Sequence, residues 1–145
     1  MHDMIFINYA VADLDRSREF FTALGYRFDD RFCDGNAAAL VLGDHIVCML
    51  MRREFYADFT DKQIVDATTS SEVLVNLSAA GREEVDQIVD RAVALGAKDG
   101  RTDDHGFMYG RDFEDLDGHG WGIMWMDPAA VEAGPEEFMK QQQGA

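Results

Sequence analysis

The chain is poor in cysteine, in basic residues and in long apolar runs, and each shortage excludes a class of protein. Two cysteines, Cys33 and Cys48, show no metal-binding spacing, which indicates reduced cytoplasmic thiols and no disulfide or zinc framework. Against 28 Asp and Glu there are 13 Lys and Arg, giving a formal net charge of −15. Such a chain would repel a nucleic-acid backbone or an anionic membrane surface, so we expect neither partner. No apolar run reaches the roughly 18 residues of a membrane-spanning helix, and no signal peptide is expected.

What is present suffices for a folded core, since 47% of the 145 residues are hydrophobic and 28% are charged. The first half, residues 4–52, predicts the order β-α-β-β-β. Asp13 can cap a helix whose apolar residues recur at helical spacing, and Gly25 can end it in a left-handed conformation. Short runs separated by turn residues predict the strands, at 4–11, 26–32, 36–43 and 45–52.

The second half, residues 71–127, repeats this order. Its predicted helix, 81–95, has one apolar and one charged side. The predicted strands are 71–77, 97–104, 106–113 and 120–126. "ALGY" at Ala23 and "ALGA" at Ala94 lie 71 positions apart, and so do Gly35 and Gly106. A repeat of this length indicates two copies of one supersecondary unit within a single domain.

Two segments lie outside these modules. Residues 53–70 connect them and carry Phe55, Phe59 and Ile64 as apolar anchors, which predicts a short helix and a loop. This segment serves either as a lid over a pocket or as a cover for a sheet edge, and the sequence leaves both open. The C-terminal segment, 128–145, begins with a proline suited to a first helical turn and ends in a polar tail expected to fray.

These features resemble the vicinal oxygen chelate superfamily, which includes glyoxalase I, fosfomycin and bleomycin resistance proteins and extradiol dioxygenases. The resemblance spans residues 4–127 and is carried by "VADLDRSREFFTALGY", by the paired β-α-β-β-β order and by "DLDGHGWGIMW". The segments "SSEVLVNLS" and "FMYGRDFEDLDGHGW" look like bacterial predicted lactoylglutathione lyases. The resemblance implies an α+β domain whose two tandem modules form a curved, eight-stranded mixed sheet around a cavity, and it implies a homodimer.

In that superfamily one divalent metal is held by His, Glu or Gln side chains that point into the cavity. The shared ligand positions fall here on Phe6, Glu72 and Gly122. Phenylalanine and glycine cannot bind a metal, and one carboxylate is far from the three or four protein ligands of known sites. We therefore expect no metal cofactor. Four histidines lie at the N-terminus or in predicted turns, and we read each as exposed: His2, His45, His105 and His119.

Alternation of side chains along the strands predicts which residues line the cavity. The predicted lining is mostly apolar with a few polar groups, as in a small-molecule site, although a packed core with a few satisfied polar residues has the same composition. Its residues are Phe6, Asn8, Glu72, Leu74, Asn76, Tyr109, Arg111, Gly122 and Met124. The other face of the last strand, with Trp121, Ile123 and Trp125, is expected to pack under the helices.

Glu72 has two interpretations. It is either a general base or substrate-orienting carboxylate, or a structural partner of Arg111. The sequence accordingly predicts a glyoxalase- or bleomycin-resistance-like protein that binds a small organic ligand in an apolar cleft without metal. The alternative is a glyoxalase-like lyase or dioxygenase-like enzyme whose non-standard or metal-free site uses Glu72, and a third reading is a dimeric scaffold that binds no small ligand.

Overall fold

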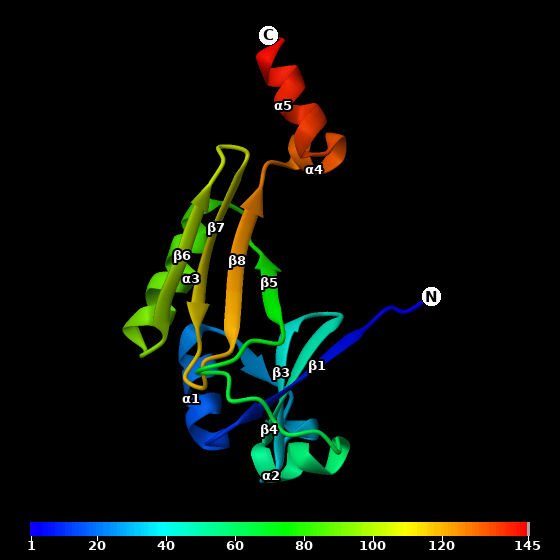
Figure 1. Ribbon diagram of the computed structural model, residues 1–145, viewed down its shortest axis with the longest axis vertical. Coiled ribbons are helices and arrows are strands. Elements are labelled where there is room, and N and C mark those ends of the chain that lie inside the picture. Colours follow the sequence, from blue (N-terminus) through cyan, green and yellow to red (C-terminus); the bar gives the residue numbers. More distant parts are fainter. Residues whose placement is uncertain (145) are drawn as a thin grey trace. The chain divides into compact units, whose positions relative to one another are not determined.

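The computed structural model describes residues 1–144, which divide into two compact units (Figure 1). The first unit contains Met1–Glu72 together with Leu116–Gly118. The second contains Val73–Asp115 and the chain from His119 onward. Each unit holds one four-stranded mixed sheet with a helix against it, so the fold class is α+β.

The first module follows the predicted order. Its elements are β1 (Ile5–Val11), α1 (Leu14–Leu24), β2 (Arg27–Phe28), β3 (Ala37–Gly43) and β4 (Ile46–Arg52). The sheet order is β1-β4-β3-β2, with β1 parallel to β4 and the other pairs antiparallel. The predicted helix boundaries are confirmed. The Asp13 side chain accepts a hydrogen bond from the Arg16 N–H, and Gly25 ends the helix with a φ of 115°.

The second module repeats this topology. Its elements are β5 (Leu74–Ser78), α3 (Arg82–Ala94), β6 (Lys98–Asp104), β7 (Met108–Glu114) and β8 (Gly120–Met126). The sheet order is β5-β8-β7-β6, with β5 parallel to β8. The duplication predicted from the sequence is confirmed. The eight strands form two separately hydrogen-bonded sheets of four, one in each module.

Two predicted strands are shorter than expected. The strand predicted for 26–32 ends at Phe28, and a short 3-10 helix, η1 (Asp30–Phe32), follows it. The carboxylate of Asp29 accepts a hydrogen bond from the Arg31 N–H and turns the chain, as aspartate does in tight turns. The strand predicted from residue 71 begins only at Leu74.

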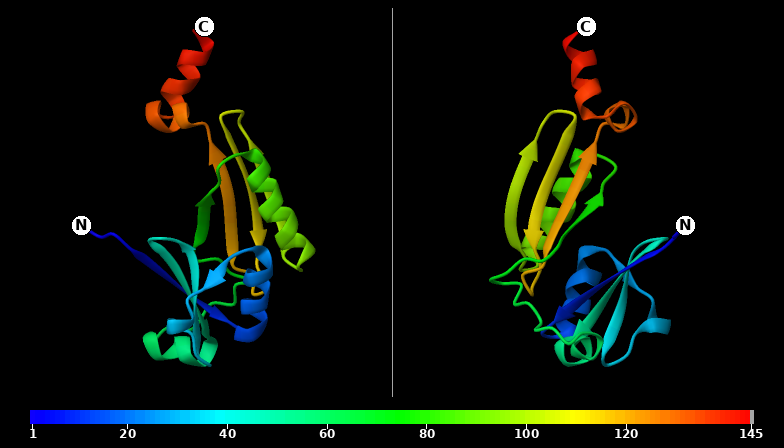
Figure 2. Two further views of the ribbon diagram at one scale, coloured as in Figure 1. Left: turned by 180° about the vertical axis from the view of Figure 1, so that it is seen from behind. Right: turned by 45° about the vertical axis from the view of Figure 1, so that its right-hand side comes forward.

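The connecting and C-terminal segments contain helices. Between the modules, α2 (Arg53–Tyr56) and η2 (Ala57–Phe59) follow β4, and α2 contacts the edge strand β1 as well as β4, as an edge cover would. The C-terminal segment forms α4 (Pro128–Ala133) and α5 (Pro135–Gln143). The prediction of a frayed polar tail is therefore wrong for the residues up to Gln143, which are helical. Both views in Figure 2 show α4 and α5 extending past the end of β8.

Each sheet buries one face against its helix. In the first unit the core contains Phe20 and Phe21 of α1 with Leu40 and Leu50 of the sheet. In the second unit the core side chains come from α3 and the facing strands: Val85, Val89, Ala92, Phe113, Trp121 and Ile123. None of the helices in residues 1–144 is long and apolar enough to cross a membrane.

Candidate functional site

Strand β8 presents two different faces to its surroundings. Trp121 and Ile123 are almost fully buried on the side of α3, as predicted for the helix-facing side. Gly122 and Met124 therefore point to the opposite side, because successive strand residues alternate. We call this opposite side of the second sheet the open face, and it carries Leu74, Asn76, Asp112, Gly122 and Met124.

Gly122 lies at the centre of a row across the open face. It pairs with Asn76 of β5 on one side and with Asp112 of β7 on the other. A Cβ atom at position 122 would lie 1.8 Å from Asn76 Oδ1 and 2.9 Å from Asp112 Oδ1. Both oxygens thus lean over the glycine backbone from opposite sides. Because residue 122 has no side chain, the amide of Asn76 occupies the place where its Cβ would lie.

Asp112 was not among the residues predicted for the site. Its half-buried carboxyl has a pKa above the ordinary value because burial disfavours the charged form. The positive charge of Arg101 lowers this pKa and the negative charge of Asp103 raises it. Those two residues form an ion pair of their own at 3.2 Å. A signal in the sequence could have found Asp112, because the "DLDG" turn fixes a hairpin register that places it opposite Gly122.

Apolar side chains flank this polar row. Leu74 is 70% exposed, and its side chain lies over Gly120, where an added Cβ would come within 2.6 Å of Leu74 Cδ2. Met124 is half-buried two residues beyond Gly122 and pairs with Gly110. The open face therefore combines two oxygen acceptors with apolar surface on both sides, a mixture typical of organic-ligand sites.

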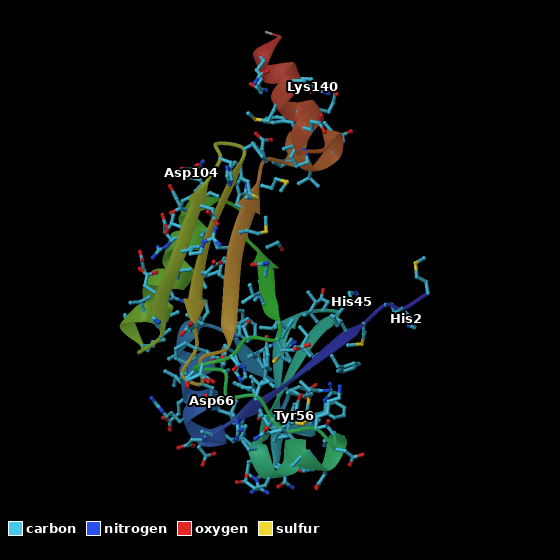
Figure 3. The ribbon with its side chains drawn as sticks, in the orientation of Figure 1. His2, His45, Tyr56, Asp66, Asp104 and Lys140 are labelled. Atoms are coloured by element: carbon cyan, nitrogen blue, oxygen red, sulfur yellow. The ribbon has the colours of Figure 1, made fainter. Side chains whose placement is uncertain are left out.

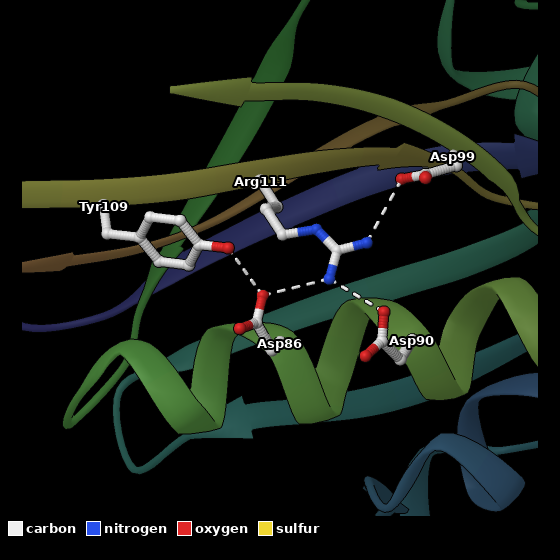
Figure 4. Close-up of polar contacts among 5 residues, drawn as sticks. All are labelled: Asp86, Asp90, Asp99, Tyr109 and Arg111. Atoms are coloured by element: carbon white, nitrogen blue, oxygen red, sulfur yellow. Dashed lines mark hydrogen bonds and ion pairs between the residues drawn. The ribbon is translucent and has the colours of Figure 1, made fainter. Parts of the chain in front are cut away.

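The structure places Tyr109 and Arg111 on the opposite side of the sheet, so the prediction that they line the same site is wrong. Tyr109 pairs with Trp125 and Arg111 with Ile123, so both share the helix-facing side of β8. Figure 4 shows their side chains directed at α3, where the Tyr109 hydroxyl donates a 2.7 Å hydrogen bond to Asp86 Oδ1.

Arg111 is the centre of an ion-pair network between α3 and the sheet. Its guanidinium lies 3.0 Å from Asp86, 2.8 Å from Asp90 and 3.4 Å from Asp99, and its side chain is 12% exposed. Burial lowers the pKa of Arg111, but hydrogen bonds to Asp90 and Asp86 outweigh burial and the net pKa is raised. Hydrogen bonds from Tyr109 and Arg111 lower the pKa of Asp86. This network holds α3 on the sheet, and it pairs the guanidinium of Arg111 with three aspartates of the second unit.

The first sheet has a corresponding face. Phe6 pairs with Val47 and Asn8 with Met49, and both Phe6, at 59%, and Asn8 are exposed. Asn8 lies five residues before the helix cap Asp13, and Asn76 lies five residues before the cap of α3. The two asparagines are therefore equivalent in the two modules. In the strand pairing, Asn8 is paired with Met49, whereas Asn76 is paired with Gly122.

Comparison with known proteins agrees with this geometry. Residues 4–43 match the family described as bleomycin resistance protein-like N-terminal, and no curated protein sequence matches the chain. A solved hypothetical protein from S. aureus is 25% identical, with a TM-score of 0.74 over 86% of this chain and 95% of that one. A glyoxalase/bleomycin resistance protein/dioxygenase family enzyme from Burkholderia phytofirmans is 17% identical, with a TM-score of 0.71 over 86% and 99%.

The fosfomycin resistance protein FosX from Listeria monocytogenes is 16% identical, with a TM-score of 0.64 over 86% of this chain and 93% of that one. The chain has the vicinal oxygen chelate fold. The resemblance drawn from the sequence is thereby confirmed at the level of the fold.

Comparison of the two modules changes the predicted position of one metal ligand. Phe6 lies seven residues before the cap Asp13, and the residue seven before the α3 cap Gly81 is Leu74. Counted from the helix caps, the second-module position equivalent to Phe6 is Leu74 and not the predicted Glu72. Glu72 is exposed and precedes β5, so it does not share the alternating face of that strand.

The residues at these positions do not suit the metal of the vicinal oxygen chelate fold. Phe6, Leu74 and Gly122 offer no side-chain donor. Within residues 1–144, no three His, Cys, Asp or Glu side chains gather closely enough to hold a metal ion. Known transition-metal sites use three or four protein ligands, which the carboxylate and amide of the open face do not supply.

None of the four histidines is among the residues of the open face. His2 belongs to the N-terminal segment and His45 to the β3–β4 turn (Figure 3), and together with Asp3, Met4 and Ile5 they line a shallow, open depression beside β1. His105 lies between β6 and β7, and His119 directly precedes β8. The exposed positions predicted for His2, His45 and His105 are confirmed, whereas His119 is half-buried.

Proposed function

We propose that this chain binds a small organic molecule on the open face of the second sheet, without a metal at the position that the vicinal oxygen chelate fold uses. One observation carries the proposal. Asn76 Oδ1 lies 1.8 Å from the place where a side chain at residue 122 would begin, so a carboxamide takes the place of a metal-binding carboxylate. Names of proteins with this fold, including FosX and bleomycin resistance proteins, agree with a role in handling small organic molecules.

The open face supplies the contacts that such binding needs. Asn76 can donate and accept hydrogen bonds, and Asp112 accepts them when ionised. Leu74 and Met124 supply apolar contact on either side of the polar row. Sites for organic ligands usually consist of apolar surface with a few polar groups that fix the orientation of the ligand.

Native mass spectrometry of chain purified without chelator tests the proposal. We expect a co-purified organic molecule and no stoichiometric metal, and we expect Asn76→Ala to lose that molecule because it removes the amide over Gly122. Gln87→Ala is the matched control, since it deletes an exposed amide on α3 and leaves the open face intact. Stoichiometric Ni, Zn, Mn or Fe, lost together with the organic molecule on treatment with EDTA, would contradict the proposal.

A metal-free reaction that uses Glu72 is separable from simple binding. Glu72 is exposed and lies outside β5, at the end of the first unit. We expect Glu72→Gln to leave the amount of co-purified molecule unchanged, because the side chain does not belong to the open face. Loss of the molecule in this variant would return Glu72 to the site.

Two further properties belong to the same proposal. The vicinal oxygen chelate resemblance supports a homodimer, which sedimentation at several concentrations would test. The free cysteines Cys33 and Cys48 suit a reducing compartment and support a cytoplasmic location.

A further inference from the structure

Asp112 differs from the other aspartates of the second sheet in its surroundings. Asp99, Asp103 and Asp104 each form an ion pair with an arginine, at 3.4, 3.2 and 2.7 Å. Within residues 1–144, the carboxyl of Asp112 takes part in no hydrogen bond or ion pair. The positive charge of Arg101 lowers the pKa of Asp112, but its guanidinium donates hydrogen bonds to both carboxylate oxygens of Asp103.

A half-buried carboxylate without a counter-ion is an unfavourable arrangement. Burial withdraws water from the charge, and folded proteins usually compensate with a cation or with N–H and O–H donors. Among the described residues no donor contacts the Asp112 carboxyl, and the nearby positive charge of Arg101, which is paired with Asp103, does not outweigh the effect of burial; Asp103 adds a second negative charge. The open face therefore favours a positive group or a strong donor that arrives from outside.

Asn76 adds a second acceptor at the same point. Its Oδ1 and the Oδ1 of Asp112 lie 1.8 and 2.9 Å from one position above the Gly122 backbone. Two acceptors converging in this way match a group with several adjacent N–H donors. A protonated amino group has three N–H donors and a positive charge, whereas a hydroxyl has one donor and no charge.

We propose that the open face selects organic amines, with the ammonium group bound between Asn76 and Asp112 and the hydrocarbon part against Leu74 and Met124. This inference rests on the proposed binding function and adds the chemical class of the ligand. The exposed Leu74 and half-buried Met124 flank the polar row and offer apolar surface for that hydrocarbon part. The strong negative charge of the whole chain also draws cations toward it.

Benzylamine and benzyl alcohol form a matched pair of probes for this inference, because they share the ring and differ in the ammonium group. Titration of the full chain at neutral pH, followed by amide proton–nitrogen NMR spectra, reports binding at each backbone N–H. We expect benzylamine to shift the signals of Asn76 and Gly122 and to bind about tenfold more tightly than benzyl alcohol. We expect Asp112→Asn to reduce benzylamine to the affinity of the alcohol.

Asp44→Asn is the charge-matched control. Asp44 is exposed in the β3–β4 turn of the first unit. Its substitution therefore removes one negative charge at a position far in sequence from the open face. An equal weakening by Asp44→Asn would overturn the inference, since the overall charge would then account for the binding. Equal affinity for the two probes would overturn the amine class alone. Unchanged Asn76 and Gly122 signals with both probes would overturn the binding face as well.

Discussion

We expect the Gly122→Ala substitution to weaken ligand binding while leaving the stability of the protein almost unchanged. The reason lies in the two side chains, Asn76 and Asp112, that flank Gly122 on the open face. The new Cβ meets Asn76 Oδ1 at 1.8 Å and Asp112 Oδ1 at 2.9 Å, and both atoms end side chains that can rotate. Asn76 is exposed, so its amide can swing away into solvent. Alanine also suits a strand better than glycine by roughly 0.5–1 kcal/mol. We therefore expect the free energy of unfolding of Gly122→Ala to change by less than about 1 kcal/mol.

Binding should respond much more strongly. Asn76 Oδ1 has to move by on the order of 1–2 Å to reach an ordinary contact distance from the new methyl group. A ligand hydrogen bond to that oxygen is then lost or strained, which corresponds to about 1 kcal/mol for a neutral donor and more for a charged one. We expect about tenfold weaker binding of benzylamine, measured by the same NMR titration.

Two other glycines provide the comparison. At Gly100 an added Cβ meets the backbone oxygen of Asp112 at 2.8 Å, and backbone cannot rotate away. At Gly118 the φ is +91° and the Cβ meets the Ala67 carbonyl oxygen at 2.7 Å. We expect Gly100→Ala to lose about 2 kcal/mol and Gly118→Ala about 3 kcal/mol of unfolding free energy. Urea denaturation followed by tryptophan fluorescence measures all three variants.

A Gly122→Ala variant as unstable as Gly118→Ala would contradict a rotating Asn76 side chain, because Asn76 would then be a fixed part of the core. Unchanged affinity of Gly122→Ala for benzylamine would contradict the proposed binding contact. In that case the amide over Gly122 would have no part in recognition.

The remaining predictions concern the Arg111 network and a buried contact of the second unit, and an ion pair of the first unit. Arg111→Ala leaves three carboxylates around an empty place and should lower stability by about 2–3 kcal/mol, less than for a fully buried pair because the carboxylates reach solvent. Arg31→Ala, which breaks a surface ion pair with Asp29, should leave the urea midpoint nearly unchanged. Asp115→Ala removes the acceptor of the buried Trp121 indole N–H, 2.9 Å away, and should lower the urea midpoint by the equivalent of about 3 kcal/mol; wild-type stability would contradict that contact. The lowered pKa of Asp86 gives stability that is present above its ordinary pKa of 3.8 and lost as pH falls below it. The raised pKa of Tyr109 gives stability that is present below 10.0 and lost as pH rises through its folded pKa, so Tyr109→Phe should remove this alkaline component from thermal unfolding followed against pH.

Most of the fold could be predicted because local chemistry and tertiary structure agree along most of the chain. The Asp13 cap, the left-handed Gly25 and the spacing of apolar residues between them all mark α1 at the boundaries that the structure shows. The strand predicted for 26–32 failed where a single side chain acted on the backbone. Asp29 turned the chain through the Arg31 N–H, a contact that hydrophobic pattern does not report.

The site was predicted less well because alternation gives two faces without telling which faces the helix. Alternation predicts Tyr109 and Arg111 in the lining of the cavity, yet their hairpin partners Trp125 and Ile123 lie on the helix side of β8. The position equivalent to Phe6 was counted from the end of the strand, and the helix cap shifts it from Glu72 to Leu74. In physical terms, a residue's face follows from its cross-strand partner and not from its own strand alone.

The packing of the β7–β8 turn has a consequence for dividing the protein into fragments. Leu116–Gly118 belongs to the first unit although both flanking residues belong to the second. Asp117 accepts a 2.8 Å hydrogen bond from the Ala12 N–H, just after β1. A fragment ending at Glu72 would therefore lack the acceptor for that N–H, and a fragment beginning at Val73 would carry a turn stripped of its packing partners. A cut between Glu72 and Val73 therefore separates the first unit from three residues that belong to it.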